Sequence, residues 1–397
     1  MSAAALWLSA GDACRLLGVN RATLYAYVSR GRVRSQPQPG TTRERRYSRE
    51  DVERLRRHTA ARRDPDQASK QALQWGTPVL ESALTLIDGA RLYYRGHDAL
   101  RLARTRSVAE VASLLWTGRF DVAWPRVAQL RVPRAVAALP FAPRTQALLA
   151  AAADQEAVAL DLRPERVART GWRILHLMTA AATLAQHPAD TIDSTLGHAW
   201  KQRAAAVDVI RCALILLADH ELNVSSFTAR CVASAGSHPY AVVIAAMSAL
   251  EGPRHGATSA RVESMLRSLR HARSARAGVT ERLRHGEALE GFGHPLYRDG
   301  DPRAAALLDL LQEHSPKSPE LPFVRDVADA AWTTIGERPN VDFALAALAR
   351  ILRLPPGAPL MLFAIGRTIG WIGHAIEQYG TGQLIRPRAQ YVGVVPA

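Results

Sequence analysis

The 397-residue sequence has few cysteines, which limits the kinds of site that it can build. Cys14, Cys212 and Cys231 are too few and too far apart for a disulfide framework or a metal site. The N-terminal MSAAALWLSA has no basic region ahead of its apolar residues and does not predict a signal peptide. No uncharged apolar run is long enough to cross a membrane. We therefore expect a cytoplasmic protein with no metal ion and no membrane contact.

Lysine is almost absent, since only Lys70, Lys201 and Lys317 occur among 51 basic residues. The formal net charge of +15 is therefore carried by arginine, whose forked guanidinium group grips carboxylates and phosphates. Residues 1–63 hold 14 arginines against five acidic residues, a net charge of +9. This concentration indicates a nucleic-acid partner near the N-terminus. An arginine-rich codon usage would raise the charge everywhere and does not explain it.

Two short helices are predicted at the start of the chain. Ser9 precedes AGDACRLL, which ends at Gly18, and Asn20 precedes RATLYAYVSR, which ends at Gly31. Two helices joined by a tight glycine turn predict a helix-turn-helix. The second would be the recognition helix, whose N-terminal end offers three candidates for DNA contact: Arg21, Thr23 and Tyr25.

The segment VRSQPQPGTTRERRYS predicts a β-hairpin wing that turns at Gly40, and a third helix follows over 49–58. The wing carries three arginines that could reach phosphates: Arg43, Arg45 and Arg46. The stretch 7–58 resembles the winged helix-turn-helix of MerR-type regulators and excisionase-like proteins. We assign residues 1–60 to this domain and 61–76 to a linker. The alternative is a small helical module used only for protein contacts.

Residues 77–397 show helical periodicity almost throughout, so we expect an all-α body with its chemistry in loops and at helix ends. Four ionisable residues stand in such places: His220, His255, His294 and Asp342. Arg367 lies in the middle of the apolar helix PLMLFAIGRTIGWIGHAIEQ, where it needs a carboxylate from the protein or from a ligand. Glu377 is too far along that helix to pair with it, which favours a bound anion.

Each of these residues also has an ordinary structural explanation. A histidine in a turn more often holds the backbone than acts in catalysis, and Asp342 could simply face a helix dipole. Arg303 and Arg386 could be solvated surface charges. What points to an active site is the combination of three histidines, a carboxylate and several arginines in one helical chain.

Seven motifs follow one another in the order of the citrate synthase family: HELN at 220–223, GPRHG at 252–256, GFGH at 291–294, DPR at 301–303, NVDF at 340–343, RTIGW at 367–371 and RPRAQYVG at 386–393. DGARLYYRGHDALRLA at 88–103 is similar to an early segment of that family. The resemblance covers about 77–397. It implies a citrate synthase fold, in which a small helical domain at about 255–355 is inserted into a large helical domain.

The resemblance also implies an acyltransferase that condenses acetyl-CoA with oxaloacetate to give citrate and CoA, the reaction of the tricarboxylic acid cycle, with acetyl-CoA as substrate and no cofactor. Asp342 would remove a proton from the acetyl methyl group, His255 would stabilise the enol, and His294 would polarise the keto group of oxaloacetate. Four residues would hold its carboxylates: His220, Arg303, Arg367 and Arg386. Arg298 would lie near the CoA phosphates.

In the family, the counterpart of Arg386 comes from the other subunit, so the resemblance implies a homodimer with shared active sites. The usual GPLHGGAN appears here as GPRHGATS, which places Arg254 at an apolar position. This change leaves open which acyl-CoA fits the site. Propionyl-CoA would give 2-methylcitrate instead. Two further alternatives are a regulator that senses a metabolite and binds DNA, and an enzyme whose N-terminal module only assists assembly.

Overall fold

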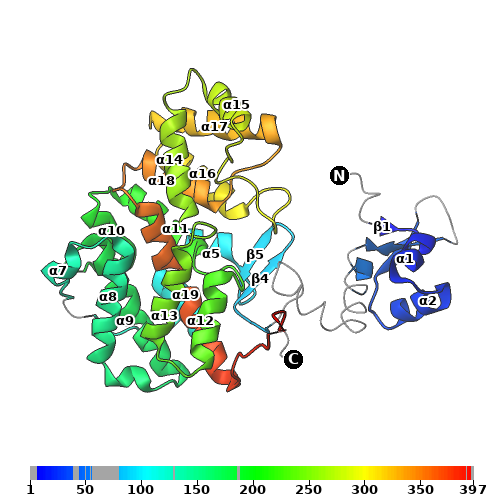
Figure 1. The fold of residues 1–397 in the computed structure, drawn as a ribbon, viewed down its shortest axis with the longest axis horizontal. Coiled ribbons are helices and arrows are strands. Elements are labelled where there is room, and N and C mark those ends of the chain that lie inside the picture. Colours follow the sequence, from blue (N-terminus) through cyan, green and yellow to red (C-terminus); the bar gives the residue numbers. More distant parts are fainter. Residues whose placement is uncertain are drawn as a thin grey trace. The chain divides into compact units, whose positions relative to one another are not determined.

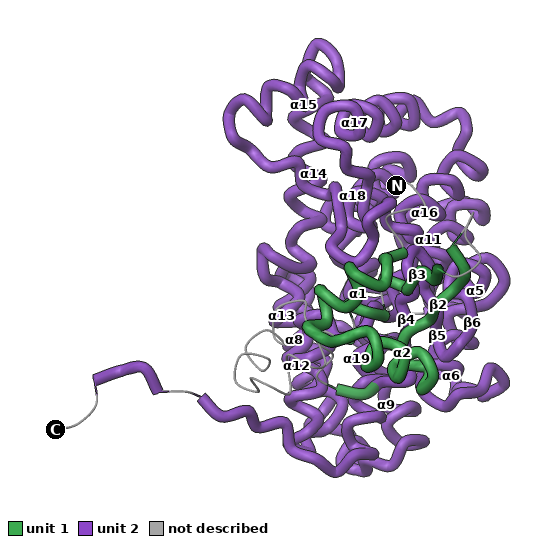
Figure 2. Tube along the Cα trace, turned by 90° about the vertical axis from the view of Figure 1, so that its right-hand side faces the viewer, with its two compact units in different colours: residues 1–81 green, residues 82–397 purple. Residues whose placement is uncertain are grey.

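The computed structural model describes residues 7–38, 44–49, 51–53, 55, 80–127, 130–185, 188–389 and 391–394. The chain forms two compact units, residues 1–81 and residues 82–397, which Figure 2 shows in green and purple. Each unit has a hydrophobic core of its own. The predicted linker at 61–76 lies outside the described residues.

The first unit contains the predicted helix-turn-helix. Its helices begin where expected because the side chains of Ser9 and Asn20 accept backbone N–H groups of the first turns, and Gly18 ends the first helix at a φ of 64°. The elements are β1 (Trp7–Leu8), α1 (Ala10–Leu17), α2 (Arg21–Ser29), β2 (Ser35–Pro37) and β3 (Arg45–Ser48). The strands form an antiparallel sheet in the order β1-β3-β2.

The predicted wing corresponds to the antiparallel pair β2 and β3, in which Ser35 faces Tyr47. Its turn at Gly40, together with Arg43, lies outside the described residues. Residues 49, 51–53 and 55 have helical backbone, in the region of the predicted third helix. Asp51 accepts hydrogen bonds from the backbone and the side chain of Arg34, which joins this segment to the start of the wing.

The second unit is mostly helical, as predicted (Figure 1). It has one 3₁₀ helix, η2 (Ala157–Leu160), among the described residues. The described α-helices are α5 (Ala99–Thr105), α6 (Val108–Thr117), α7 (Arg134–Ala137), α8 (Phe141–Asp154), α9 (Pro164–Thr183), α10 (Ile192–Ala199), α11 (Ala204–Leu216), α12 (Val224–Ser234), α13 (Pro239–Leu250), α14 (Thr258–Leu269), α15 (Ala275–Arg284), α16 (Pro302–His314), α17 (Glu320–Ile335), α18 (Val341–Ile351) and α19 (Ala358–Thr381).

A small sheet at the start of this unit departs from the all-α prediction. Its strands are β4 (Thr85–Asp88), β5 (Arg91–Tyr94) and β6 (His97–Asp98), paired antiparallel in that order. The strands are too short for their two-residue period to stand out against the surrounding helical pattern. The pair Asp88-Gly89 between alternating apolar residues was nevertheless a hairpin signal, and Gly89 has the φ of 59° that such a turn requires.

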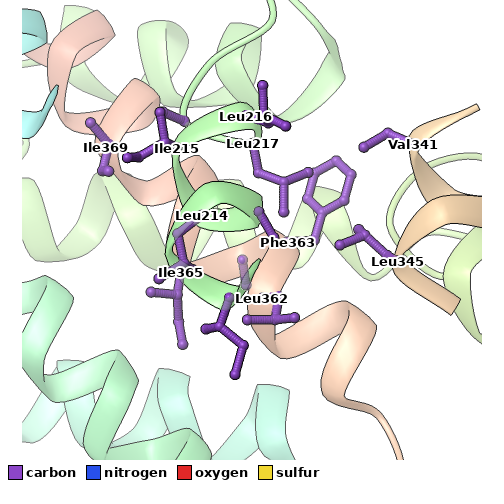
Figure 3. Close-up of a cluster of buried hydrophobic side chains, with 14 of the residues drawn as sticks. Leu214, Ile215, Leu216, Leu217, Val341, Leu345, Leu362, Phe363, Ile365 and Ile369 are labelled. Atoms are coloured by element: carbon purple, nitrogen blue, oxygen red, sulfur yellow. The ribbon is translucent and has the colours of Figure 1, made fainter. Parts of the chain in front are cut away.

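Helix α19 runs through the core of the second unit and packs against α9, α11, α12 and α13. Among the described residues it is the one helix long and apolar enough to cross a membrane by length and composition, yet 83% of its most apolar window is buried inside the protein. Figure 3 shows its Leu362, Phe363 and Ile365 packed with Leu214 and Leu217 at the end of α11. The core around α19 is therefore also the surroundings of Arg367.

Helices α14 to α18 lie together at one end of the second unit, at the top of Figure 1. They come from the stretch in which a small domain was predicted, about 255–355. Residues 82–397 form one compact unit, so the division into a large and a small domain stays a prediction.

The close approach of α19 to the loop after α11 gives a stability prediction. A Cβ on Gly370 would lie 2.4 Å from Asp219 Oδ1 and 2.5 Å from the carbonyl oxygen of Ala218, whereas a Cβ on Gly380 of the same helix would meet nothing within 4 Å. We expect Gly370→Ala to lower the free energy of unfolding by about 1–3 kcal/mol. Gly380→Ala should be neutral or stabilising by up to about 1 kcal/mol, since alanine favours helix. Urea unfolding of both variants would measure this, and equal effects would contradict the packing described.

Candidate active site

The site residues predicted from the sequence come from different parts of the second unit. The three histidines lie in three loops: His220 between α11 and α12, His255 between α13 and α14, and His294 between α15 and α16. Arg303 and Asp342 lie in the first turns of α16 and α18, and Arg367 lies in the middle of α19.

His220 and His294 meet through a third ring, that of Tyr297. The Tyr297 hydroxyl lies 2.9 Å from His220 Nε2, and the two histidine rings have centroids 5.2 Å apart. The His294 and Tyr297 rings are 4.9 Å apart. The backbone N–H of Leu296 donates to His294 Nδ1 at 3.1 Å, which leaves Nε2 as the nitrogen that carries the proton in the neutral ring.

The carboxylate of Asp301 joins the starts of two helices. It accepts hydrogen bonds from Arg303 Nε at 2.9 Å and Nη2 at 2.7 Å, and from the backbone N–H of Val341 at 3.1 Å. Asp301 and Arg303 are both 2% exposed. Burial opposes the charge of Arg303, but the adjacent Asp301 raises its pKa. One buried ion pair therefore fixes a guanidinium group beside the turn that carries Asp342.

Arg367 is the second buried guanidinium group, with 1% of its surface exposed. Its Nε donates to the carbonyl of Leu217 at 2.8 Å, and its guanidinium lies 5.0 Å from the Phe363 ring centroid. Burial lowers its pKa to about 10, and the buried carboxylate of Asp219 acts in the opposite direction. Asp219 therefore supplies part of the countercharge of Arg367 from within the protein, while the favoured bound anion stays a prediction. No carboxylate of the described residues forms a direct ion pair with Arg367.

His255 belongs to a hydrogen-bonded group at the start of α12. Its Nε2 lies 2.8 Å from Ser225 Oγ, which also lies 2.8 Å from Asn223 Oδ1. Trp371 Nε1 of α19 donates to the same hydroxyl at 3.1 Å. These contacts fix the orientation of the His255 ring, whose centroid lies 5.9 Å from that of the Phe363 ring in an edge-to-face arrangement.

Asp342 is partly buried, and burial raises its pKa to about 6. Asn340 caps α18 by accepting the N–H groups of Asp342 and Phe343, so the backbone of this turn is fixed. Ser259 donates to Asp342 Oδ1 at 2.6 Å. The charges of Arg303 and Arg367 favour the ionised carboxylate, whereas Asp301 disfavours it.

The imidazoles share the positive surroundings of these arginines. Burial lowers the pKa of His294 and of His255 to about 4, helped by Arg303 for His294 and by Arg367 for His255. Burial also holds the pKa of His220 well below its usual value, together with both arginines. At neutral pH all three rings are uncharged hydrogen-bond donors or acceptors.

These mutual effects show that six of the predicted residues form one electrostatic cluster: His220, His255, His294, Arg303, Asp342 and Arg367. It combines a carboxylate base, neutral imidazoles and two buried cations, which suits proton transfer next to a bound dianion. No three His, Cys, Asp or Glu side chains of the described chain converge in a way that could hold a metal ion.

Two further predicted residues lie outside this cluster. Arg298 is exposed on the loop before α16. Arg386 is exposed in the irregular segment 383–389, which extends away from the body of the second unit in Figure 2. No hydrogen bond or ion pair links either residue to the cluster within the described part of one chain.

The candidates for DNA contact lie in the first unit. Arg21 is exposed and the Tyr25 side chain is 51% exposed, while the hydroxyl of Thr23 donates to the capping Asn20 at 2.9 Å. In the wing, Arg45 donates to Ser35, and the Arg46 guanidinium lies 5.5 Å from the Trp7 ring centroid. Arg43 lies outside the described residues.

The structure adds residues that the sequence reasoning missed: Asp219, Ser225, Ser259, Tyr297 and Asp301. Each stands in or near one of the seven motifs, so closeness to a motif in the sequence could have marked it as a candidate. Only long-range contacts reveal what they do, such as that of Tyr297 with His220 across 77 positions of sequence.

Comparison with known proteins agrees with this architecture. A family model described as "Citrate synthase, C-terminal domain" matches residues 72–388, and one described as "Helix-turn-helix domain" matches residues 7–59. Citrate synthase 2 of Bacillus subtilis is 36% identical over 190 residues, which are 47% of this chain and 51% of the relative, so the match spans about half of its length.

Other relatives align along most of their length. The 2-methylcitrate synthase of Shewanella oneidensis is 29% identical over 81% of this chain and 94% of the relative, and citrate synthase of Haloferax volcanii is 31% identical over 80% and 94%. Among solved structures, citrate synthase of Thermoplasma acidophilum in a ternary complex with carboxymethyl coenzyme A and oxaloacetate has a TM-score of 0.67 and 25% identity, covering 81% of this chain and 95% of that one. The chain therefore belongs to the citrate synthase family and carries a helix-turn-helix domain ahead of the citrate synthase fold.

Proposed function

We propose that this protein is an acyltransferase that condenses acetyl-CoA with oxaloacetate to give citrate and CoA. The observation that supports this most is Asp342, a partly buried carboxylate whose pKa is raised to about 6, set among neutral imidazoles and the buried Arg303 and Arg367. A base of this strength is ionised at neutral pH and still takes up a proton readily. We propose the cytoplasm as the place of the reaction.

In the proposed first step, Asp342 removes a proton from the acetyl methyl group. The electron pair of the broken C–H bond forms a C=C bond, the C=O electron pair moves to the thioester oxygen, and His255 donates a hydrogen bond to this enolate oxygen. Ser225, 2.8 Å from His255 Nε2, holds the ring in place for this donation. A thioester α-proton is weakly acidic, so base and hydrogen-bond donor must act together.

In the second step, the enolate carbon attacks the keto carbon of oxaloacetate, and the thioester C=O bond re-forms. His294 Nε2–H donates to the keto oxygen and then protonates it as it becomes an alkoxide, because Leu296 occupies Nδ1. Water then hydrolyses the citryl thioester and releases CoA. Throughout, His220, Arg303 and Arg367 hold the substrate carboxylates.

We further propose that the site is completed by a second copy of the chain, whose Arg386 reaches the bound oxaloacetate. The exposed, extended segment around Arg386 supports this arrangement, since it projects from the body of its own chain. Arg298 would lie close to the CoA phosphates. Propionyl-CoA is the alternative acyl donor, which would make the product 2-methylcitrate, and the 2-methylcitrate synthase relative supports keeping it in the assay.

The proposed reaction predicts the effect of Asp342→Asn, which keeps the shape of the side chain but removes the base. Thiol release from acetyl-CoA or propionyl-CoA should depend on oxaloacetate in the unaltered protein. It should fall by about 10²-fold or more in the variant. Calorimetric binding of oxaloacetate, unchanged in the variant, would be the control. Equal rates of oxaloacetate-dependent release in both proteins would exclude Asp342 as the base.

The shared site predicts complementation between two inactive variants. A mixed dimer of Asp342→Asn and Arg386→Ala chains contains one site with both unaltered residues if Arg386 acts across the subunit boundary. Coexpression of the two chains should then restore roughly a quarter of the normal activity, because half of randomly formed dimers are mixed and half of their sites are intact. No restoration above the separate variants would place Arg386 in its own chain's site or outside the chemistry.

A second candidate function is DNA binding by the first unit, with the citrate synthase fold as a sensor of oxaloacetate, citrate or acyl-CoA. It is favoured by the net charge of +9 in residues 1–63 and by the exposed Arg21 and Tyr25 on α2. In a dimer, two such helices would suit a palindromic site.

DNA binding would be tested by gel shift of genomic fragments with the full chain at several salt concentrations. Phosphate contacts predict a steep loss of affinity with salt, and Arg21→Ala should weaken specific binding about tenfold. Arg15→Ala removes an equal charge from α1, where Arg15 pairs with Asp12, and should have little effect. Equal losses in both variants, or no shift with any fragment at low salt, would argue against a recognition helix.

A further inference from the structure

The loop between α13 and α14 reaches Asp342 through a residue with no role in the reaction proposed above. Ser259 lies in the first turn of α14, four residues after His255, and its side chain is 0% exposed. Its hydroxyl donates to Asp342 Oδ1 at 2.6 Å. Its backbone N–H is bound to the carbonyl of Gly256 at 3.2 Å, which holds Ser259 in the same tight loop as His255.

This hydrogen bond involves only one of the two carboxylate oxygens of Asp342. Ser259 occupies Oδ1 from the buried side, whereas Oδ2 has no hydrogen-bond partner among the described residues. Asp342 retains some exposed surface although Ser259 has none. A carboxylate held in this way presents its free oxygen to whatever enters the site.

We propose that Ser259 is a positioning residue for the base: its hydroxyl holds Oδ1 of Asp342 so that Oδ2 takes the proton from the acyl-CoA substrate. The role in catalysis rests on the function proposed above, while the contact itself does not. The proton moves from the α-carbon to Oδ2, the C–H electron pair becomes the C=C bond of the enolate as the C=O pair moves to the thioester oxygen, and Ser259 keeps its own proton throughout.

A hydrogen bond to the ionised form of a carboxyl group stabilises that form, so Ser259 also keeps Asp342 a carboxylate close to neutral pH. Three charged groups on the helices packed around α18 also act on the pKa of Asp342. They are Asp301 and Arg303 at the start of α16, and Arg367 on α19. On α17, Glu320 pairs with Arg350 at the far end of α18. Ser259 is the uncharged member of this set, so its removal changes no net charge.

Ser259 and His255 stand in one short stretch of the chain, GPRHGATS at 252–259. The same short loop therefore supplies the proposed enol-stabilising imidazole and the group that orients the base. This coupling would align the two partners of the enolisation step by one rigid turn.

The test compares Ser259→Ala with Thr258→Ala, a matched loss of the neighbouring hydroxyl, which contacts the carbonyl of Pro253 and not Asp342. The carboxyl group of Asp342 would be titrated by NMR with ¹³C-labelled aspartate, and the Asp342→Asn protein would identify its signal. We expect Ser259→Ala to move the titration midpoint upwards by about one pH unit. Thr258→Ala should leave it unchanged. An unchanged midpoint in Ser259→Ala would overturn the proposed contact whether or not the protein is a synthase.

The rate measurements then test the catalytic part of the proposal. In an active synthase, the acid limb of the kcat/KM profile for thiol release, which reports the pKa of the free enzyme, should move upwards with the NMR midpoint in Ser259→Ala. The limiting kcat at high pH should fall about tenfold, because the base is no longer held in line. A shifted midpoint with unchanged limiting kcat would overturn the positioning role. Ser259→Cys, of similar size but with a weaker donor, should give an intermediate midpoint and serves if the alanine variant does not fold.

Discussion

The buried positive charge of Arg303 and Arg367 is the constraint on which the rest of the site depends. A guanidinium group in an apolar core is stable only when hydrogen bonds and opposite charge surround it. Asp301 meets Arg303 directly, while Arg367 relies on a carbonyl, an aromatic face and the more distant Asp219. The compensation of Arg367 is therefore incomplete in the protein alone. An anion bound beside it would complete the balance, which is the physical basis for expecting an anionic ligand.

These charged side chains lie together because hydrogen bonds to the backbone hold the helices and loops that carry them in place. Asp301 ties the start of α18 to Arg303, and Asn340 caps the turn that carries Asp342. On the other side, Gly370 lets α19 approach the loop before His220 so closely that its N–H also lies 2.8 Å from the carbonyl of Ala218. Backbone contacts therefore set the relative positions of α16, α18, α19 and the loop after α11. These elements place Asp342, Arg367 and His220.

The sequence predicted the fold where the signal was local, as for the capped helices after Ser9 and Asn20. Its motifs also pointed to residues that the structure brings together, among them His255 and His294, whose roles stay predictions. It did not predict the small sheet at Thr85–Asp98, whose strands are too short to establish a period. It also left Asp219 and Ser259 unnoticed. A buried aspartate and a buried serine look ordinary in a sequence. Their partners lie on helices more than 80 positions later, with Asp342 on α18 beside Ser259 and His374 on α19 beside Asp219.

The same positive charges decide what each proposed proton carrier can do. Burial lowers the pKa of His255 and of His294, helped by Arg367 for His255 and by Arg303 for His294, so both rings are neutral at neutral pH. A neutral imidazole with a pKa of about 4 is a weak base but retains one N–H to donate, and Leu296 fixes that proton on Nε2 of His294. Burial raises the pKa of Asp342 to about 6, above the values of these two imidazoles, so Asp342 is the group best able to accept a proton in the cluster. Burial raises the pKa of the carboxyl group and lowers the pKa of the imidazoles, so one group serves as base and the others as hydrogen-bond donors. Enolisation followed by carbonyl addition requires these two separate roles.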